Sequence, residues 1–302
     1  MIANSKIIRA VAAVFILLIS SCGEDENVPV ISGGSSSDSN EPDHYTVEFE
    51  PALSIDGDEV YFVATDSLFP QKHGIYRARV ASPQRVQLFE GHGFHSPVAA
   101  PDGFTLAFLS GGVVYYLDIA DSSISAAGFD GHYEAVVYIN DSIVVACAAN
   151  LMYLINVNDS SDTRFSSGSD PTFYAPNQFV CLSERTTGVW DIRRVTYRNI
   201  TEGDQFTDDT LATITSDGRI RWVSLEPSTD RYVYVEQVGG INSVYTGQIG
   251  VQERNFIATT DHAKPLMLGF NLLIYSGPDG RFYQSTFDGR TQVPFWHGIT
   301  SE

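Results

Sequence analysis

The stretch Pro97–Phe129 reads PVAAPDGFTLAFLSGGVVYYLDIADSSISAAGF, and its pattern returns along most of the chain. It begins with a short apolar segment that ends in Asp102-Gly103, a pair that favours a tight hairpin turn. An apolar run, Leu106–Leu109, follows, and then a second run with Tyr115 at its second position. Short apolar runs bounded by turn residues are typical of strands covered on both faces. The stretch therefore predicts one antiparallel sheet of four short strands.

A strand with an aromatic residue at its second position occurs six times. In the fourth strand the position of the aromatic residue, Trp190, is assigned to within one residue. The six pairs are Ile75-Tyr76, Val114-Tyr115, Met152-Tyr153, Val189-Trp190, Val244-Tyr245 and Phe282-Tyr283. The aromatic residues are spaced by 39, 38, 37, 55 and 38 positions. The single long spacing predicts an insertion of about 17 residues between 196 and 221, as an elongated hairpin or loop of the fourth unit.

Units of four antiparallel strands with a period near 40 residues are the mark of a β-propeller. The predicted fold class is therefore all-β, a six-bladed β-propeller of four-stranded antiparallel blades over residues 44–302. A β-sandwich would explain the strands but not the recurring aromatic residue. Two arrangements remain possible for the closure of the ring. Thr46–Phe49 adds a strand to the last sheet, or Gln292–Phe295 ends that sheet alone.

The order Pro-x-x-Ser-x-Asp-Gly, apolar strand, Ile-Tyr and Asp-Gly resembles the repeats of TolB-type, WD-like propellers. The units that begin at Pro51, Pro97 and Pro265 carry this order well. The third unit has Ala135 in place of the leading proline, and the fifth departs most. The motifs are structural, so the resemblance implies a fold. TolB proteins also have an N-terminal domain, and the segment between Cys22 and Phe49 is too short for one.

Residues 1–21 have the features of a secretory signal peptide, namely a basic start with Lys6 and Arg9 and then the apolar run Ala10–Ser20. About 11 apolar residues are too few for a spanning helix, which needs roughly 20. The run ends in Ile19-Ser20-Ser21-Cys22, which resembles the bacterial lipobox. That resemblance implies cleavage before Cys22 and a lipid on its thiol. An ordinary signal peptide ending near a cysteine is the other interpretation.

Residues 22–43 are rich in Ser, Gly and acidic residues and contain no aromatic residue, so they predict a flexible acidic tether. The cluster Glu24-Asp25-Glu26 resembles surface-export signals of some lipoproteins, although solvated linker charges explain it equally simply. We expect a lipid-anchored protein of the cell envelope, on the outer membrane rather than the inner one. It would face either the periplasm or the cell surface.

The charge of the chain restricts its partners. The formal net charge is −19, and removal of Lys6 and Arg9 with the signal peptide leaves −21. Nucleic acid is disfavoured because phosphate binding needs Lys and Arg. Besides Cys22 the chain has only Cys147 and Cys181, each within a predicted strand. Two thiols are too few for a framework of disulfide bonds. Both cysteines are interpreted as small buried hydrophobic residues.

The sequence holds no familiar catalytic motif, but one group of polar residues lies in the links that precede innermost strands. This group is His92, His95, His132, His262 and Asp170. Innermost strands of a propeller begin at one end of the central channel, so these side chains form a candidate ligand or metal site there. Imidazoles and carboxylates suit zinc or similar divalent ions, and some sugar-acid lyases resemble this arrangement. Gly91-His92 and Gly131-His132 also resemble the Gly-His pair of WD repeats, where the histidine is structural.

Two functions remain open. The first is a non-catalytic envelope lipoprotein, anchored by its lipid, whose propeller serves as a binding or scaffold module for a protein or glycan and needs no cofactor. The alternative is a metal-dependent lyase or hydrolase that acts on an envelope polysaccharide with a site at the channel mouth.

Overall fold

The structure is a computed structural model of the chain, and it describes residues 46–66, 69, 72–80, 85–200, 203–261, 264–269 and 271–295. The regular elements in these ranges are strands, and they form six antiparallel four-stranded sheets, each from four consecutive strands. No helix in these ranges is long and apolar enough to cross a membrane. The predicted six-bladed β-propeller is confirmed.

The strands of each blade follow one another from the innermost to the outermost. Blade one contains β1 (Thr46–Leu53), β2 (Glu59–Asp66), β3 (Gly74–Arg79) and β4 (Arg85–Glu90). Blade two contains β5 (Phe94–Ala99), β6 (Thr105–Ser110), β7 (Val113–Asp118) and β8 (Ile124–Asp130). Blade three contains β9 (Ala135–Asn140), β10 (Ile143–Ala148), β11 (Leu151–Asn156) and β12 (Asp162–Ser167). Blade four contains β13 (Ser169–Ala175), β14 (Gln178–Thr186), β15 (Val189–Ile200) and β16 (Gly203–Thr215). Blade five contains β17 (Arg219–Glu226), β18 (Arg231–Val238), β19 (Ile241–Gln248) and β20 (Arg254–Thr260). Blade six contains β21 (Leu266–Gly269), β22 (Leu272–Ser276), β23 (Phe282–Thr286) and β24 (Gln292–Pro294).

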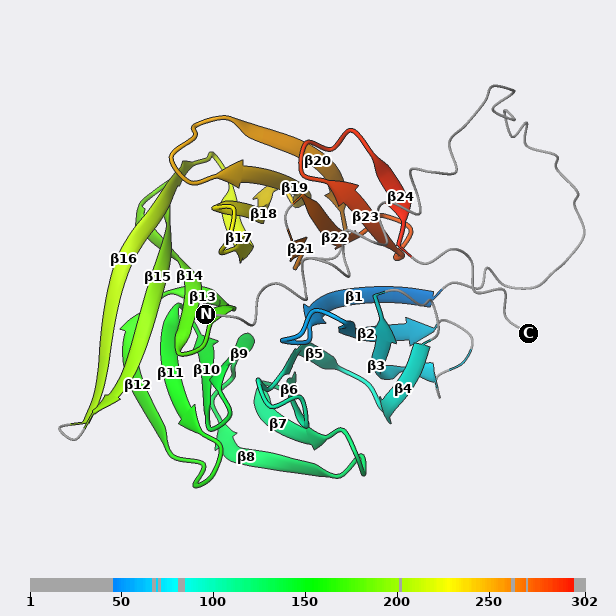
Figure 1. Ribbon diagram of the computed structural model, residues 1–302, viewed down its shortest axis with the longest axis vertical. Coiled ribbons are helices and arrows are strands. Elements are labelled where there is room, and N and C mark those ends of the chain that lie inside the picture. Colours follow the sequence, from blue (N-terminus) through cyan, green and yellow to red (C-terminus); the bar gives the residue numbers. More distant parts are fainter. Residues whose placement is uncertain are drawn as a thin grey trace, which may run out of the picture. The chain divides into compact units, whose positions relative to one another are not determined.

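The six sheets stand around a common centre, with β1, β5, β9, β13, β17 and β21 facing it (Figure 1). Each of these innermost strands contacts the next one around the ring, and β21 contacts β1. Because every blade has the same strand order, all six innermost strands run in the same direction. Their starts surround one end of the axis of the ring, and we call this end the channel mouth.

The hydrophobic core is divided into six clusters, one between each pair of neighbouring blades. The cluster between blades six and one, for example, joins Val60 and Phe62 to Ile274 and Phe282, with the two phenylalanine rings edge to face at 5.4 Å. A single blade would leave both of its apolar faces in water. Packing against two neighbours buries both faces, which explains the continuous apolar strands of the sequence.

The recurring aromatic residue packs between blades, as the repeat predicts. Tyr76, Tyr115, Tyr153, Tyr245 and Tyr283 each lie partly buried against the cluster shared with the preceding blade. Blade four is the exception, because Arg193 pairs with Cys181 at the corresponding register. Trp190 lies three residues earlier and packs in the cluster shared with blade five. Its predicted register, uncertain by one residue, is therefore wrong by three.

The ring closes without any exchange of strands. Thr46–Phe49 belongs to β1 in blade one, and β24 completes blade six, so the second of the two predicted arrangements holds. Hydrogen bonds cross the seam instead. The amide of Glu48 donates to the carbonyl of Gly280 at 2.7 Å, and the Ser276 hydroxyl donates to the carbonyl of Glu48 at 2.6 Å.

The predicted insertion is an elongated hairpin of blade four, which confirms that expectation. β15 has 12 residues and β16 has 13, and they pair from Val189 with Thr215 to Ile200 with Gly203, with one register shift between Ile192 and Arg193. Figure 1 shows these two strands extending past their neighbours. Because β15 runs in the same direction as the innermost strand β13, the turn of this hairpin lies at the end of the blade away from the channel mouth. The ring of Phe206 stacks on Phe165 of blade three at 4.0 Å, which holds the hairpin against that blade.

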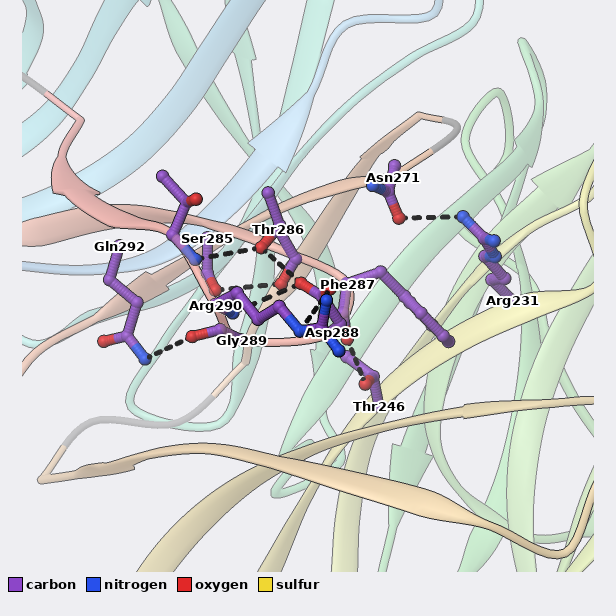
Figure 2. Close-up of polar contacts among 11 residues, drawn as sticks. Arg231, Thr246, Asn271, Ser285, Thr286, Phe287, Asp288, Gly289, Arg290 and Gln292 are labelled. Carbon is purple, nitrogen blue, oxygen red and sulfur yellow. Dashed lines mark hydrogen bonds and ion pairs between the residues drawn. The ribbon is translucent and has the colours of Figure 1, made fainter.

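Polar contacts supplement the apolar ones between blades five and six (Figure 2). Thr246 donates its hydroxyl to the carbonyl of Phe287 at 2.6 Å, and Arg231 donates to Asn271 at 2.8 Å. Phe287 precedes the predicted turn at Asp288-Gly289, where Gly289 has a φ of 72°. Asp288 fixes this turn by accepting hydrogen bonds from the Thr286 hydroxyl and the Arg290 amide. The Asp-Gly pair thus forms the hairpin turn that the sequence predicts.

Cys147 and Cys181 are free, fully buried thiols in the cluster between blades three and four. Burial raises the pKa of each to about 12. Both act as small apolar residues, as the sequence predicts.

Candidate functional site

A left-handed residue recurs at the equivalent position of five blades, within the innermost strand in four of them and two residues before β21 in blade six. These residues are Glu50 (φ 55°), Ser96 (50°), Asp170 (51°), Trp222 (46°) and Lys264 (77°). In blades one, two, four and five this residue lies in a register shift of the innermost strand. Blade three differs, because Ala135 pairs directly with Cys147.

The local sequence explains this backbone. Four of the five residues precede a proline, namely Pro51, Pro97, Pro171 and Pro265. Proline has no N–H for the ladder and is tolerated where a bulge interrupts it. A side-chain-bearing residue in the left-handed region costs about 1–3 kcal/mol, and such strain concentrates at functional sites. The ring of bulges therefore directs attention to the side chains that it holds.

Glu50 links blades one and two. Its carboxylate accepts a hydrogen bond from the amide of Ser96 and lies 3.7 Å from Nδ1 of His95. Burial acts to raise the pKa of Glu50, but His95, Lys264 and the Ser96 amide together hold it below its ordinary value. The same contact raises the pKa of His95. Glu50 is thus an anion at neutral pH, and its partners His95 and Lys264 come from two other blades.

Asp170 and Arg221 form the opposite part of the site. Asp170 is only 5 % exposed, and burial raises its pKa against the opposing effect of Arg221. Burial likewise lowers the pKa of Arg221, and Asp170 opposes that shift. The guanidinium of Arg221 lies 3.6 Å from the ring centre of Trp222. Among the described residues, neither Oδ2 of Asp170 nor Nε of Arg221 has a hydrogen-bond partner.

Lys264 completes a cluster of four ionisable groups that we call the mouth cluster, consisting of Glu50, Asp170, Arg221 and Lys264. Burial lowers the pKa of Lys264, while the charges of Glu50 and Asp170 raise it. The cations come from blades five and six and the anions from blades four and one. The site therefore offers groups of both signs in an environment of reduced dielectric, where charged contacts are strengthened.

The structure separates the residues that the sequence groups together. His95 contacts Glu50, and Asp170 belongs to the mouth cluster. His92 contacts His73 of blade one instead, with the two Nδ1 atoms 2.5 Å apart. His132 lies exposed in the link before β9, with a φ of 49°. His262 falls outside the described residues.

Metal binding at these positions stays a prediction. In the part of the chain that the structure describes, no group of three or more His, Cys, Asp or Glu side chains is placed to hold a metal ion. Because His262 lies outside that part, the predicted set as a whole is not tested.

Sequence reasoning missed Glu50, Arg221, Trp222 and Lys264. A signal was nonetheless present, because aligning the repeats on the leading proline places Glu50, Asp170 and Lys264 in one column directly before it. The histidines attracted attention because of their chemistry. The column before the proline becomes important only through its shared left-handed backbone, which the sequence does not show.

The sequence matches no family model and no curated protein sequence. Its fold is similar to that of TolB from Acinetobacter baumannii, with a TM-score of 0.58 and 17 % identity over 82 % of this chain and 62 % of that one. A putative TolB from Agrobacterium tumefaciens gives a TM-score of 0.53 and 14 % identity, over 72 % of this chain and 85 % of that one. An oligogalacturonate lyase in complex with manganese gives 0.50 and 14 %, over 83 % of this chain and 78 % of that one.

At these identities the likeness concerns the fold, and it confirms a TolB-like propeller. The chain spans 62 % of the length of the A. baumannii protein. The neighbours include both TolB proteins and a metal-bound lyase, so the function has to be argued from the site itself.

Proposed function

We propose that this protein is a lipid-anchored, non-catalytic binding module of the cell envelope, and that its propeller recognises a protein partner at the channel mouth. The observation that carries the proposal is the pair of buried polar atoms in Asp170 and Arg221 that lack partners among the described residues. A buried polar atom without a partner costs about 1–3 kcal/mol. A partner whose binding moves the covering side chains and supplies the matching donor and acceptor would recover that cost.

The mixed signs of the mouth cluster favour a protein over a neutral glycan. Arg221 and Lys264 attract carboxylates, and Glu50 and Asp170 attract ammonium or guanidinium groups. A peptide segment carries charges of both kinds close together, whereas a neutral glycan carries none. Trp222 adds an aromatic surface beside the guanidinium of Arg221, and tryptophan and arginine are enriched at the centres of protein interfaces.

The proposed location rests on the N-terminal sequence. Residues 1–21 have the features of a signal peptide, and Ile19-Ser20-Ser21-Cys22 has those of a lipidation site. The acidic segment 22–43 would then connect the lipid to the propeller as a tether. An outer-membrane position, facing the periplasm or the cell surface, is part of the same proposal.

Affinity capture from the protein's own envelope tests the proposal. Wild-type protein and the Asp170→Asn and Arg221→Gln variants serve as baits, with circular dichroism to verify that each is folded. The matched controls are Asp209→Asn and Arg194→Gln, which alter an exposed ion pair with 2.7 Å between its charged atoms on the blade-four hairpin. We expect one stoichiometric protein partner, held at least about tenfold more weakly by the mouth variants, which corresponds to about 1.4 kcal/mol.

Two outcomes would contradict the proposal. One is capture that the mouth substitutions leave unchanged. The other is a stoichiometric transition metal in the purified wild-type protein by elemental analysis, which would favour the metal-dependent enzyme that acts on a polysaccharide.

A further inference from the structure

A recess lies between blades three and four, at the end of the propeller opposite the channel mouth. It has a volume of about 630 Å³ and opens to solvent. Its lining residues come from the β9–β10 and β13–β14 turns and the ends of β11 and β15, all of which point away from the mouth. We call it the asparagine groove, and it is lined by Asn140, Ser142, Ile143, Asn156, Asn177, Tyr197, Arg198 and Asn199.

Backbone amides fix the orientation of two asparagine side chains, and one of these two orients a third. The amide of Ser142 donates to Oδ1 of Asn140 at 2.9 Å, and the amide of Asn158 donates to Oδ1 of Asn156 at 3.0 Å. A backbone N–H needs an acceptor, so the oxygen of each side chain is assigned by the network. Asn140 then donates through Nδ2 to Oδ1 of Asn177 at 2.8 Å.

The consequence is that the groove presents donors. The oxygens of Asn140, Asn156 and Asn177 accept hydrogen bonds within the protein, whereas the NH₂ groups of Asn156 and Asn177 donate to no other described residue and keep both of their hydrogens for a ligand. Arg198 adds an exposed guanidinium that forms no ion pair with another described residue. None of the residues that line the groove is acidic, in a chain whose formal net charge is −19.

The floor of the groove is partly apolar. Ile143 and Tyr197 are both buried, and the Tyr197 hydroxyl donates to Asp204 at 2.8 Å within the hairpin. Apolar atoms beside hydrogen-bond donors match a sugar ring, which has C–H faces and oxygen acceptors at its edge. A guanidinium is the group best suited to hold a carboxylate through paired hydrogen bonds.

We infer that the asparagine groove binds a carboxylate-bearing sugar, a uronic acid unit of an acidic oligosaccharide. The NH₂ groups of Asn156 and Asn177 donate to its ring and hydroxyl oxygens, and Arg198 pairs with its carboxylate. The volume lies within the range of about 300–1,000 Å³ that is usual for small-ligand sites. This inference does not rest on the proposed function, because the groove and the mouth cluster lie at opposite ends of the propeller.

Isothermal titration of the full-length protein in detergent tests the inference with three probes, namely a linear tri-uronic acid, its neutral methyl ester and sodium sulfate. We expect the acid to bind at least tenfold more tightly than its ester. Asn156→Asp keeps the oxygen that the Asn158 amide requires but replaces the donor with an anion, and it should weaken binding of the acid at least tenfold. Arg198→Gln should remove the preference for the acid over the ester.

The matched control is Asn255→Asp, which adds the same charge at an exposed position of β20 and should leave binding unchanged. The Asp170→Asn mouth variant should also bind the acid normally. Loss of sugar binding can therefore be distinguished from loss of partner binding at the channel mouth. The inference is overturned by absence of binding at millimolar tri-uronic acid, by sulfate binding as tightly as the acid, or by an equal loss in Asn255→Asp.

Discussion

At the scale of single residues, the left-handed positions of the innermost strands show what the mouth requires. Glycine adopts this conformation at no steric cost, yet none of the five equivalent positions carries glycine. Three of them, Glu50, Asp170 and Lys264, carry charges instead. The backbone is thus strained at three positions that carry ionisable side chains. Such strain is expected where the chemistry of a side chain matters more than stability.

Lys264 provides a direct test of this environment. Acylating reagents attack only the neutral amine, so a lysine of ordinary pKa loses about 100-fold in rate between pH 9 and pH 7. Because burial lowers the pKa of Lys264, we expect its rate to fall clearly less than that. Quantitative mass spectrometry of labelled peptides measures the rate, with the exposed Lys72 in the same protein as internal reference.

The variant Glu50→Gln sharpens the labelling experiment. The Glu50 charge raises the pKa of Lys264, so its removal should make the labelling of Lys264 at pH 7 faster still. Equal pH dependence of Lys264 and Lys72, together with no effect of Glu50→Gln, would show that the mouth cluster does not perturb this amine.

At the scale of elements, strand β1 carries the seam of the ring and also the buried acid Glu48. The Glu48 side chain is 1 % exposed and pairs with Arg85 of β4. Burial raises its pKa to about 7, against the opposing effects of Arg85 and the Phe282 amide. In the unfolded chain a glutamate ionises near pH 4.3. The contribution of Glu48 to the free energy of unfolding is therefore largest below about pH 4.3. It decreases progressively as the pH rises to about 7.

The variant Glu48→Gln should remove this pH dependence. We expect the free energy of unfolding of the wild type, relative to that of the variant, to fall by up to about 3 kcal/mol between pH 5 and pH 8. Urea denaturation at four pH values measures the difference. Glu90→Gln, at an exposed position of β4, controls for the loss of one negative charge. The same pH profile for wild type and Glu48→Gln would contradict the assignment.

One aromatic ring on β16 contributes to the attachment of the elongated hairpin of blade four to blade three. Phe206 stacks on Phe165 and lies 5.5 Å from Tyr197, centre to centre. Phe206→Ala should lower the stability of the hairpin by about 1–2 kcal/mol, since the ring is only partly buried. Hydrogen exchange should then speed up in β15 and β16 while the other blades remain protected.

Phe256→Ala is the matched control for the hairpin, because Phe256 lies on the outermost strand of blade five and is 54 % exposed. It should leave exchange in blade four unchanged. Uniformly faster exchange through all six blades in Phe206→Ala would mean that the hairpin is part of the global folding unit and not a separately attached element.

At the scale of the whole molecule, the ring closes by packing and by hydrogen bonds at the seam, since no strand passes from one blade to another. The cluster between blades six and one is built like the other five, with Phe62 against Phe282. Each blade therefore depends on both neighbours to cover its faces. The amide of Glu48 and the hydroxyl of Ser276 add directional contacts at the one boundary where the chain itself does not continue.

Membrane attachment is the prediction that concerns the complete chain. Cys22→Ser should shift the protein from the membrane fraction to the soluble fraction, because the serine cannot receive the thioether-linked lipid. Cell fractionation with immunoblotting measures the shift, and labelled palmitate should mark the wild type alone. Cys147→Ser, which alters a buried thiol of the propeller, serves as the control. Absence of palmitate from the wild-type protein would refute lipidation.

The sequence by itself determined the number of blades, their four-stranded composition and the position of the long hairpin. These features depend on local patterns, namely apolar runs, Asp-Gly turns and the spacing of Tyr76, Tyr115 and their equivalents. Such patterns act within about 40 residues, so they can be read along the chain. Trp190 was misplaced because blade four has an arginine where the other blades have tyrosine.

Only the tertiary structure decided which side chains share a site. Glu50, Asp170, Arg221 and Lys264 come from four blades that are far apart in sequence, and the closed ring alone brings them to one mouth. Their altered pKa values arise from burial, which depends on how neighbouring blades cover each group. The asparagine groove likewise exists only where the turns of blade three meet the hairpin of blade four. Local periodicity specifies strands, whereas the electrostatics of a site depend on distances between strands that the sequence does not record.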